Sequence, residues 1–203
     1  MRHAPGPRFA KTQAMPTIDA GKVLVSRPSL LDPNFKSTVV VLFQHERQGG
    51  TMGVVINRPS PAKLSDVVEK IEGVRGREDV LWVGGPCQPN AVWVLHRRAD
   101  LEERGSEVSS GIFIGGSPEL LSTLLKTTMQ NPASSVFRVV RGYAGWGPGQ
   151  LASEIREGAW RVVEPEADVL FGAESELLWE DVLTRAQLPI RLPSGTLRRA
   201  RFN

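Results

Sequence analysis

The hydrophobic residues of this chain fall into short runs interrupted by glycine, proline and charged residues, a pattern more typical of strands than of long helices. Residues 38–43 are apolar at almost every position and rich in valine, which predicts a strand buried on both faces. Residues 48–50 then form a turn, and residues 51–57 are its expected hairpin partner. The same reasoning predicts further strands at residues 21–26, 80–83, 91–96, 112–114, 136–140 and 159–163.

Helical spacing of apolar residues appears in fewer places. A short helix is expected over residues 64–71, where apolar residues recur every three or four positions before Gly73 and Gly76 end it. The pair Ser117-Pro118 opens a second helix, with the serine as N-cap, that is expected to reach about residue 130. Two more helices are predicted at residues 148–157 and 175–185, the second with Leu178 and Val182 facing inward. The charged residues 97–108 predict a surface loop.

The mixed order of these segments, without strict alternation of strand and helix, predicts an α+β fold with a mixed sheet. The chain has 203 residues, 40% of them hydrophobic, and no internal linker, which favours one domain. We expect a loose N-terminal arm over residues 1–18, the domain over 19–186 and a basic C-terminal tail over 187–203.

Residues 141–151, which read Arg-Gly-Tyr-Ala-Gly-Trp-Gly-Pro-Gly-Gln-Leu, combine four glycines with the only tyrosine and a tryptophan. Glycine permits positive φ and close backbone approach, so this segment predicts a tight aromatic turn between a strand and a helix. Two further glycine turns, at residues 84–86 and 115–118, also lie near the ends of predicted elements. None of the three matches a phosphate-binding glycine loop, so we interpret them as turns and helix caps.

Charge and cysteine content narrow the class of protein. No run approaches the roughly 18 apolar residues of a membrane span, the N-terminus lacks the apolar stretch of a secretion signal, and one cysteine fits a reducing compartment. A cytoplasmic protein is therefore expected. The chain carries +3 overall, but residues 1–20 carry +2 and residues 185–203 carry +5, which leaves the body at −4. The basic tail is either a solvated segment or an arm for nucleic acid.

Candidate catalytic and metal-binding groups are sparse. The three histidines are scattered, no pair has metal-ligand spacing, and no metal or cofactor is predicted. Cys87 with His96 is a conceivable nucleophile pair, but a lone cysteine is more often an inert apolar residue, and Ser117 is explained as a helix cap. Three carboxylates around Pro165 lack the further ligands that a hard cation needs. No catalytic residue is therefore predicted.

Residues 142–151 resemble the YqgE/AlgH family of bacterial proteins. The resemblance extends in order over about residues 20–185, and its landmarks include residues 31–35, residues 53–59, Gly84-Gly85-Pro86 and Leu95-His96. It implies an α+β fold in which a bent mixed sheet forms a pseudo-barrel flanked by helices, no known cofactor, and an association with transcriptional regulation through the AlgH name. The chain departs from the family at Cys87, where an apolar residue is usual, which counts against a catalytic thiol.

Three hypotheses for function follow. The first is a non-enzymatic regulatory protein that binds a small molecule or a protein partner in a cleft walled by the glycine-aromatic segments. The second is direct DNA binding through the basic tail, against which the acidic body counts, and the third is a thiol- or serine-dependent enzyme. Under the first hypothesis the expected lining residues are Asn57, Arg58, Gly85, Tyr143, Trp146 and Gln150.

Overall fold

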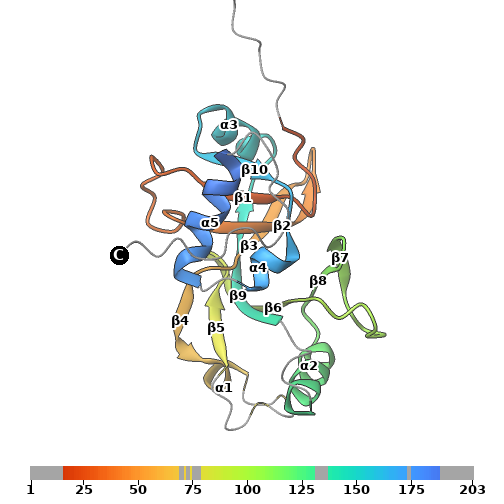
Figure 1. Ribbon diagram of the computed structural model, residues 1–203. Coiled ribbons are helices and arrows are strands. Elements are labelled where there is room, and N and C mark those ends of the chain that lie inside the picture. Colours follow the sequence, from red (N-terminus) through yellow and green to blue (C-terminus); the bar gives the residue numbers. More distant parts are fainter. Residues whose placement is uncertain are drawn as a thin grey trace, which may run out of the picture.

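The computed structural model describes residues 16–68, 71, 74, 79–130, 137–172 and 175–187 (Figure 1). Most of the predicted N-terminal arm, Gly73 and Gly76, and all of the predicted basic tail beyond residue 187 lie outside these residues. Among the described helices, none is both long and apolar enough to cross a bilayer.

Ten strands and five helices make up the part of the chain that the structure describes. The strands are β1 (Val23–Ser26), β2 (Val39–Glu46), β3 (Gly50–Val55), β4 (Pro59–Lys63), β5 (Val80–Val83), β6 (Cys87–His96), β7 (Ser106–Ser109), β8 (Ile112–Gly115), β9 (Phe137–Trp146) and β10 (Trp160–Val163). The helices are α1 (Leu64–Val67), α2 (Pro118–Gln130), α3 (Gln150–Arg156), α4 (Ala167–Gly172) and α5 (Ser175–Gln187).

The strands form one open, branched sheet in the order β10-β1-β2-β3-β9-β6-β8-β7. Strand β9 is the branch point, because its first half pairs with β5 and its second half pairs with β3, while β6 lies along its other edge. The β5–β9 pair is parallel and the other strand pairs are antiparallel. The predicted α+β fold with a bent mixed sheet is therefore confirmed.

The sheet curls around a core that helices α4 and α5 close (Figure 1). Side chains from β1, β2, β3, β6, β7, β8 and β9 meet apolar residues of both helices in a single cluster. Alternation along the strands builds it: Val23 and Val25 enter this cluster, whereas Leu24 between them packs on the opposite face. Both faces of β1 and β2 are thus covered, as the valine-rich pattern of residues 38–43 predicted.

Two outer clusters complete the fold. Helix α2 buries four leucines against β5, β6 and β9, and its predicted start is confirmed because Ser117 Oγ accepts a hydrogen bond from the Leu120 amide at 3.1 Å. Helix α3 covers the other face of β1, β2 and β3, where Trp146 and Trp160 are buried. Phe35 stacks on Trp146 with the two ring centroids 6.0 Å apart.

The prediction of a tight aromatic turn within residues 141–151 was correct only in part: β9 continues through the aromatic residues as far as Trp146, and the turn into α3 is confined to residues 147–149. Gly142 does have a positive φ of 72°, but it bends the strand where β9 passes from one half of the sheet to the other. There the Gly84 amide donates to the Arg141 carbonyl at 2.8 Å, and a Cβ on Gly142 would stand 2.5 Å from the Gly85 carbonyl oxygen. Gly142, Gly84 and Gly85 thus permit a close crossing of two backbones, whereas Gly149, with a φ of 74°, lies in the turn that begins α3.

Three other predictions need correction, and one further strand was not predicted: the proline-rich residues 59–63 form β4. The predicted loop 97–108 contains most of β7. The carboxylates around Pro165 do not lie in one loop, because α4 begins at Ala167. The helix expected over residues 64–71 ends at Val67. Each missed element is held by tertiary pairing or packing, as β4 is by β5, and local sequence does not encode such contacts.

Candidate functional site

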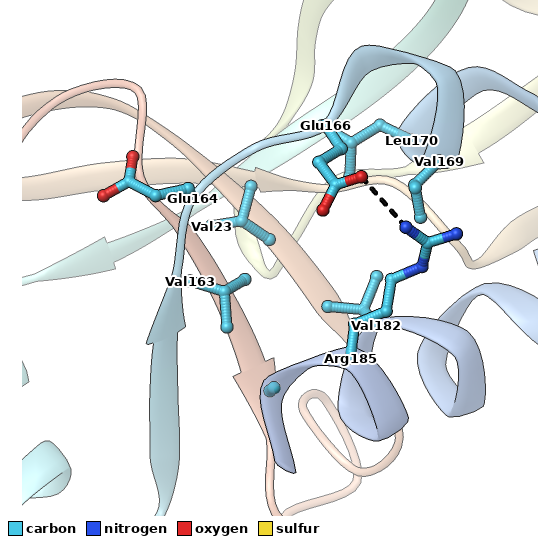
Figure 2. Close-up of a pocket in the computed structure, with 9 residues that line it drawn as sticks. Val23, Val163, Glu164, Glu166, Val169, Leu170, Val182 and Arg185 are labelled. Carbon is cyan, nitrogen blue, oxygen red and sulfur yellow. Dashed lines mark hydrogen bonds and ion pairs between the residues drawn. The ribbon is translucent and has the colours of Figure 1, made fainter. Parts of the chain in front are cut away.

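A pocket of about 110 Å³ lies between the β1–β10 edge of the sheet and helices α4 and α5 (Figure 2). Its walls are apolar side chains from both strands and both helices, and charged side chains stand at its rim. The lining residues are Val23, Val163, Glu164, Glu166, Val169, Leu170, Val182, Arg185 and Ala186.

The charges at the rim are arranged in two pairs. Glu164, in the segment after β10, forms an ion pair with Lys22, which directly precedes β1. Glu166 accepts a hydrogen bond from Arg185 Nη1 at 2.9 Å across the pocket (Figure 2). Arg185 Nε is buried and has no hydrogen-bond partner among the described residues. A buried donor without an acceptor is unfavourable by about 1–3 kcal/mol, so a rotation of the guanidinium that gives Nε an acceptor would be favourable.

Helix α4, which forms one wall of the pocket, is held by two more arginines. Arg97 pairs with Asp168 at 2.7 Å on the surface. Arg138 on β9 donates from Nε and Nη2 to the Leu170 carbonyl at 3.2 and 3.0 Å, and its guanidinium lies 4.3 Å from the centroid of the Trp82 ring. Arg138 is only 7% exposed, and burial lowers its pKa to about 10. This cation therefore remains charged at neutral pH and fixes α4 against the sheet.

The apolar walls and the charged rim of the pocket are suited to reversible binding of a small molecule. The apolar walls can exclude water from a small hydrocarbon group, and the arginine and carboxylates at the rim can select its polar end. Among the described residues, no group of three His, Cys, Asp or Glu side chains could hold a metal ion.

Of the six residues predicted to line a cleft, Asn57 and Arg58 instead contact the loop before β2. The Asn57 side chain accepts from the Val39 amide at 2.9 Å and donates to the Ser37 carbonyl at 3.0 Å. Arg58 donates from Nη1 to the carbonyls of Pro33 and Asn34, and from Nη2 to that of Lys36 at 3.2 Å. The two side chains hold this loop to the start of β4.

The other four predicted residues lie along β9 and its neighbours. Gly85 belongs to the backbone crossing with Gly142, and Tyr143 is half-buried opposite Cys87. Trp146 is buried, and its indole N–H donates to Glu154 Oε2 at 3.0 Å. Gln150 donates to Glu154 Oε1 at 2.9 Å and accepts from the Gly147 amide at 3.0 Å. None of the six lines the pocket at α4 and α5.

Glu154 and Arg185 are the residues that sequence reasoning missed. Glu154 accepts hydrogen bonds from both Trp146 and Trp160, and its position four residues after Gln150 on a predicted helix was the available signal. Arg185 falls three residues after Val182, which was expected to face inward, and therefore lies on the same helical face.

The candidate catalytic residues are not brought together. Cys87 and His96 are at opposite ends of β6 and pair with Tyr143 and Phe137, so they lie roughly 20 Å apart at about 3.3 Å per residue of β9. His96 is fully buried, its Nε2–H donates to the Arg104 carbonyl at 2.9 Å, and its Nδ1 accepts from the Arg98 amide at 3.1 Å. These partners require the neutral imidazole and leave neither nitrogen free to activate a nucleophile.

We predict that His96 makes stability depend on pH. Burial lowers its pKa below the ordinary 6.5, so in this range the unfolded chain binds the proton more tightly than the folded chain. The free energy of unfolding should therefore decrease as pH falls below about 6.5, the ordinary histidine value. Urea unfolding between pH 7.5 and 5.5 should show this slope in the wild type and little of it in H96Q. An equal slope in both chains would exclude His96 as its source.

The fold and the pocket together define a class: an α+β protein with an open, barrel-like mixed sheet whose interior two C-terminal helices close, and whose small pocket lies beside those helices. The chain belongs to the AlgH-like family, whose model matches residues 23–191. The predicted family membership is thereby confirmed.

Relatives and solved structures agree with this assignment. A UPF0301 protein of Chlorobium chlorochromatii is 41% identical over 162 residues, which cover 80% of this chain and 83% of the relative. A UPF0301 protein of Anaeromyxobacter dehalogenans is 36% identical over 184 residues, which cover 86% of this chain and 89% of the relative. The solution structure of AlgH from Pseudomonas aeruginosa has a TM-score of 0.64 at 28% identity and covers 88% of this chain and 93% of that one. The crystal structure of DIP2367 from Corynebacterium diphtheriae has a TM-score of 0.69 at 24% identity, covers 86% and 90%, and shows likeness of fold alone.

Proposed function

We propose that this protein is a cytoplasmic, non-enzymatic regulatory protein that acts by binding a small molecule in the pocket between the β1–β10 edge and helices α4 and α5. The observation that carries the proposal is the pocket itself, in which apolar walls meet a rim of paired charges. Small-molecule sites commonly combine apolar walls with a few polar groups that orient the ligand.

Regulation by this ligand would operate through α4. Arg138 fixes the Leu170 end of this six-residue helix, whereas the ion pairs at its N-terminal end, Arg97–Asp168 and Arg185–Glu166, are partly exposed. Exposed ion pairs of this kind contribute about 0–1 kcal/mol each, so a ligand that changes the contacts of Glu166 can shift the N-terminal end of α4. A downstream effect on transcription would follow from a partner that recognises α4 and α5 in one position.

The test is capture of small molecules by the native protein. Tagged wild-type and V182F chains are purified from native bacterial lysate, and the molecules released on denaturation are identified by mass spectrometry. V182F places a phenyl ring in the pocket, so we expect at least a tenfold loss of the released molecules. T184F is the matched control, because Thr184 lies on the exposed side of α5. Equal recovery from wild type and V182F would reject this pocket as the site.

A second candidate site is the surface around Tyr143. The sequence predicts that Tyr143 lines a cleft together with Asn57, Arg58, Gly85, Trp146 and Gln150. The half-buried ring of Tyr143 is the observation that favours it. Recovery of a molecule that Y143A loses and V182F retains would favour that site. Direct DNA binding by the basic tail remains the alternative proposal for a role in transcription.

A further inference from the structure

We infer that the pocket takes a short aliphatic carboxylic acid, with the hydrocarbon tail between the valines and the carboxylate on Arg185. This inference rests on the proposed ligand-binding function and names the chemical class of the ligand.

The size of the apolar space sets the length of the tail. A cavity of about 150 Å³ lined by aliphatic side chains holds a benzene molecule, so about 110 Å³ accommodates roughly four or five carbon atoms. Val23, Val163 and Val182 contribute methyl groups to its walls, and Figure 2 shows Val23 and Val163 on the side of the cavity away from the Glu166–Arg185 pair, with Val182 beside Arg185. The tail therefore lies against the valines, and the polar end of the ligand faces the rim.

The rim favours an anion over a cation. Arg185 uses Nη1 for Glu166, while its Nε is buried and lacks an acceptor among the described residues. When the guanidinium turns toward the pocket, a ligand carboxylate can accept two parallel hydrogen bonds from it, whereas Glu166 accepts only one from Arg185. An ammonium ligand would instead compete with Arg185 for Glu166 and would leave the buried Nε as it is.

The exposure of Glu166 and Arg185 also favours an anionic ligand, because it shows which of the two side chains is displaced more easily. The Glu166 side chain is 37% exposed and Arg185 is 25% exposed, so Glu166 is the partner that can turn outward into water more readily. Glu164 is paired with Lys22 and its carboxylate points away from the cavity in Figure 2, so it does not repel an incoming anion as a lone charge in the pocket would. An acid can thus replace Glu166 on Arg185 while the charge balance of the pocket is kept.

The experiment compares three probes that share one tail. Isovalerate, 3-methylbutan-1-ol and 3-methylbutylamine are titrated into the full chain, and binding is followed by the side-chain Nε–H resonance of Arg185 and by valine methyl shifts. We expect isovalerate to bind with a Kd on the order of millimolar, as befits about seven heavy atoms, and the alcohol and amine to bind at least tenfold more weakly. N-acetyl-leucine, added as a fourth probe, distinguishes the C-terminus of a peptide from a free acid: tighter binding than isovalerate assigns the carboxylate to a chain end.

Two variants test the contribution of the Arg185 charge separately from that of the apolar cavity. R185Q should lose at least tenfold in isovalerate affinity and keep its weak affinity for the alcohol, which shows that the apolar walls are intact. R97Q is the matched control, since Arg97 pairs with Asp168, two residues after the Arg185 partner Glu166, but does not line the pocket. It should bind isovalerate like the wild type. Equal binding of the acid and the alcohol, tighter binding of the amine, or unchanged isovalerate binding in R185Q would overturn the inference. Those outcomes leave the proposed pocket function standing, because small-molecule capture with V182F tests it separately.

Discussion

G142A should lower the free energy of unfolding by about 2–5 kcal/mol, a large part of the 5–15 kcal/mol typical of a folded domain. The φ of 72° contributes about 1–2 kcal/mol for any residue with a Cβ. The new Cβ would also stand 2.5 Å from the Gly85 carbonyl oxygen, and forcing apart tightly packed groups adds about 1–3 kcal/mol. The measurement is urea unfolding followed by circular dichroism.

G111A is the matched control for this prediction. Gly111 has the same φ of 72°, but a Cβ there would meet no atom within 4 Å. The loss in G111A should therefore be limited to the backbone contribution of about 1–2 kcal/mol. If the two variants are equally stable, the close crossing of residues 84–85 and 142 does not constrain the sheet.

E154A should lower the free energy of unfolding by about 2–4 kcal/mol. Glu154 accepts hydrogen bonds from Trp146, Trp160 and Gln150, and each hydrogen bond to a charged group contributes about 1.5–3 kcal/mol without being additive. Removal of the carboxylate leaves two largely buried indole N–H groups without their acceptor. Chemical unfolding gives the stability, and a change in tryptophan emission reports the environment of the two indoles.

Two further variants sharpen this measurement. E154Q keeps the volume and one acceptor oxygen, so its loss should be intermediate. E157A removes an exposed carboxylate at the C-cap of the same helix. Its side chain contacts only the Ser153 hydroxyl among the described interactions, so this variant should stay within about 0.5 kcal/mol of the wild type. A stability of E154A within that same range would show that Glu154 does not organise the aromatic cluster.

For the glycine-aromatic segment, residues 141–151, the sequence predicts the backbone conformation but not the distant segment that crosses it. Its composition correctly pointed to a positive φ and a close backbone approach, both found at Gly142. The approach comes from residues 84–85, nearly 60 positions earlier, and no local pattern shows that a distant segment will cross a strand. The same composition therefore fits both a turn and a strand that bends, and tertiary structure decides between them.

For the pocket, too, the sequence predicts local features but not contacts between distant residues. Periodicity correctly placed Leu178 and Val182 on the inner face of α5, since hydrophobic spacing within one helix is a local property. The ion pairs at the rim join residues far apart in the chain: Lys22 and Glu164 are 142 positions apart, and Glu166 and Arg185 are 19 apart. Charge patterns along the sequence do not reveal such partners, so the three carboxylates around Pro165 could not be assigned a role before the fold was known.

The most direct test of the proposed function is to locate the bound molecule on the protein. Wild-type chain with labelled valine and leucine methyl groups is titrated with the molecule recovered by native capture. The proposal predicts that the largest shifts fall on Val23, Val163, Val169, Leu170 and Val182, the methyl-bearing residues of the pocket wall. Binding with unchanged pocket methyls, and shifts confined to residues around Tyr143, would contradict it.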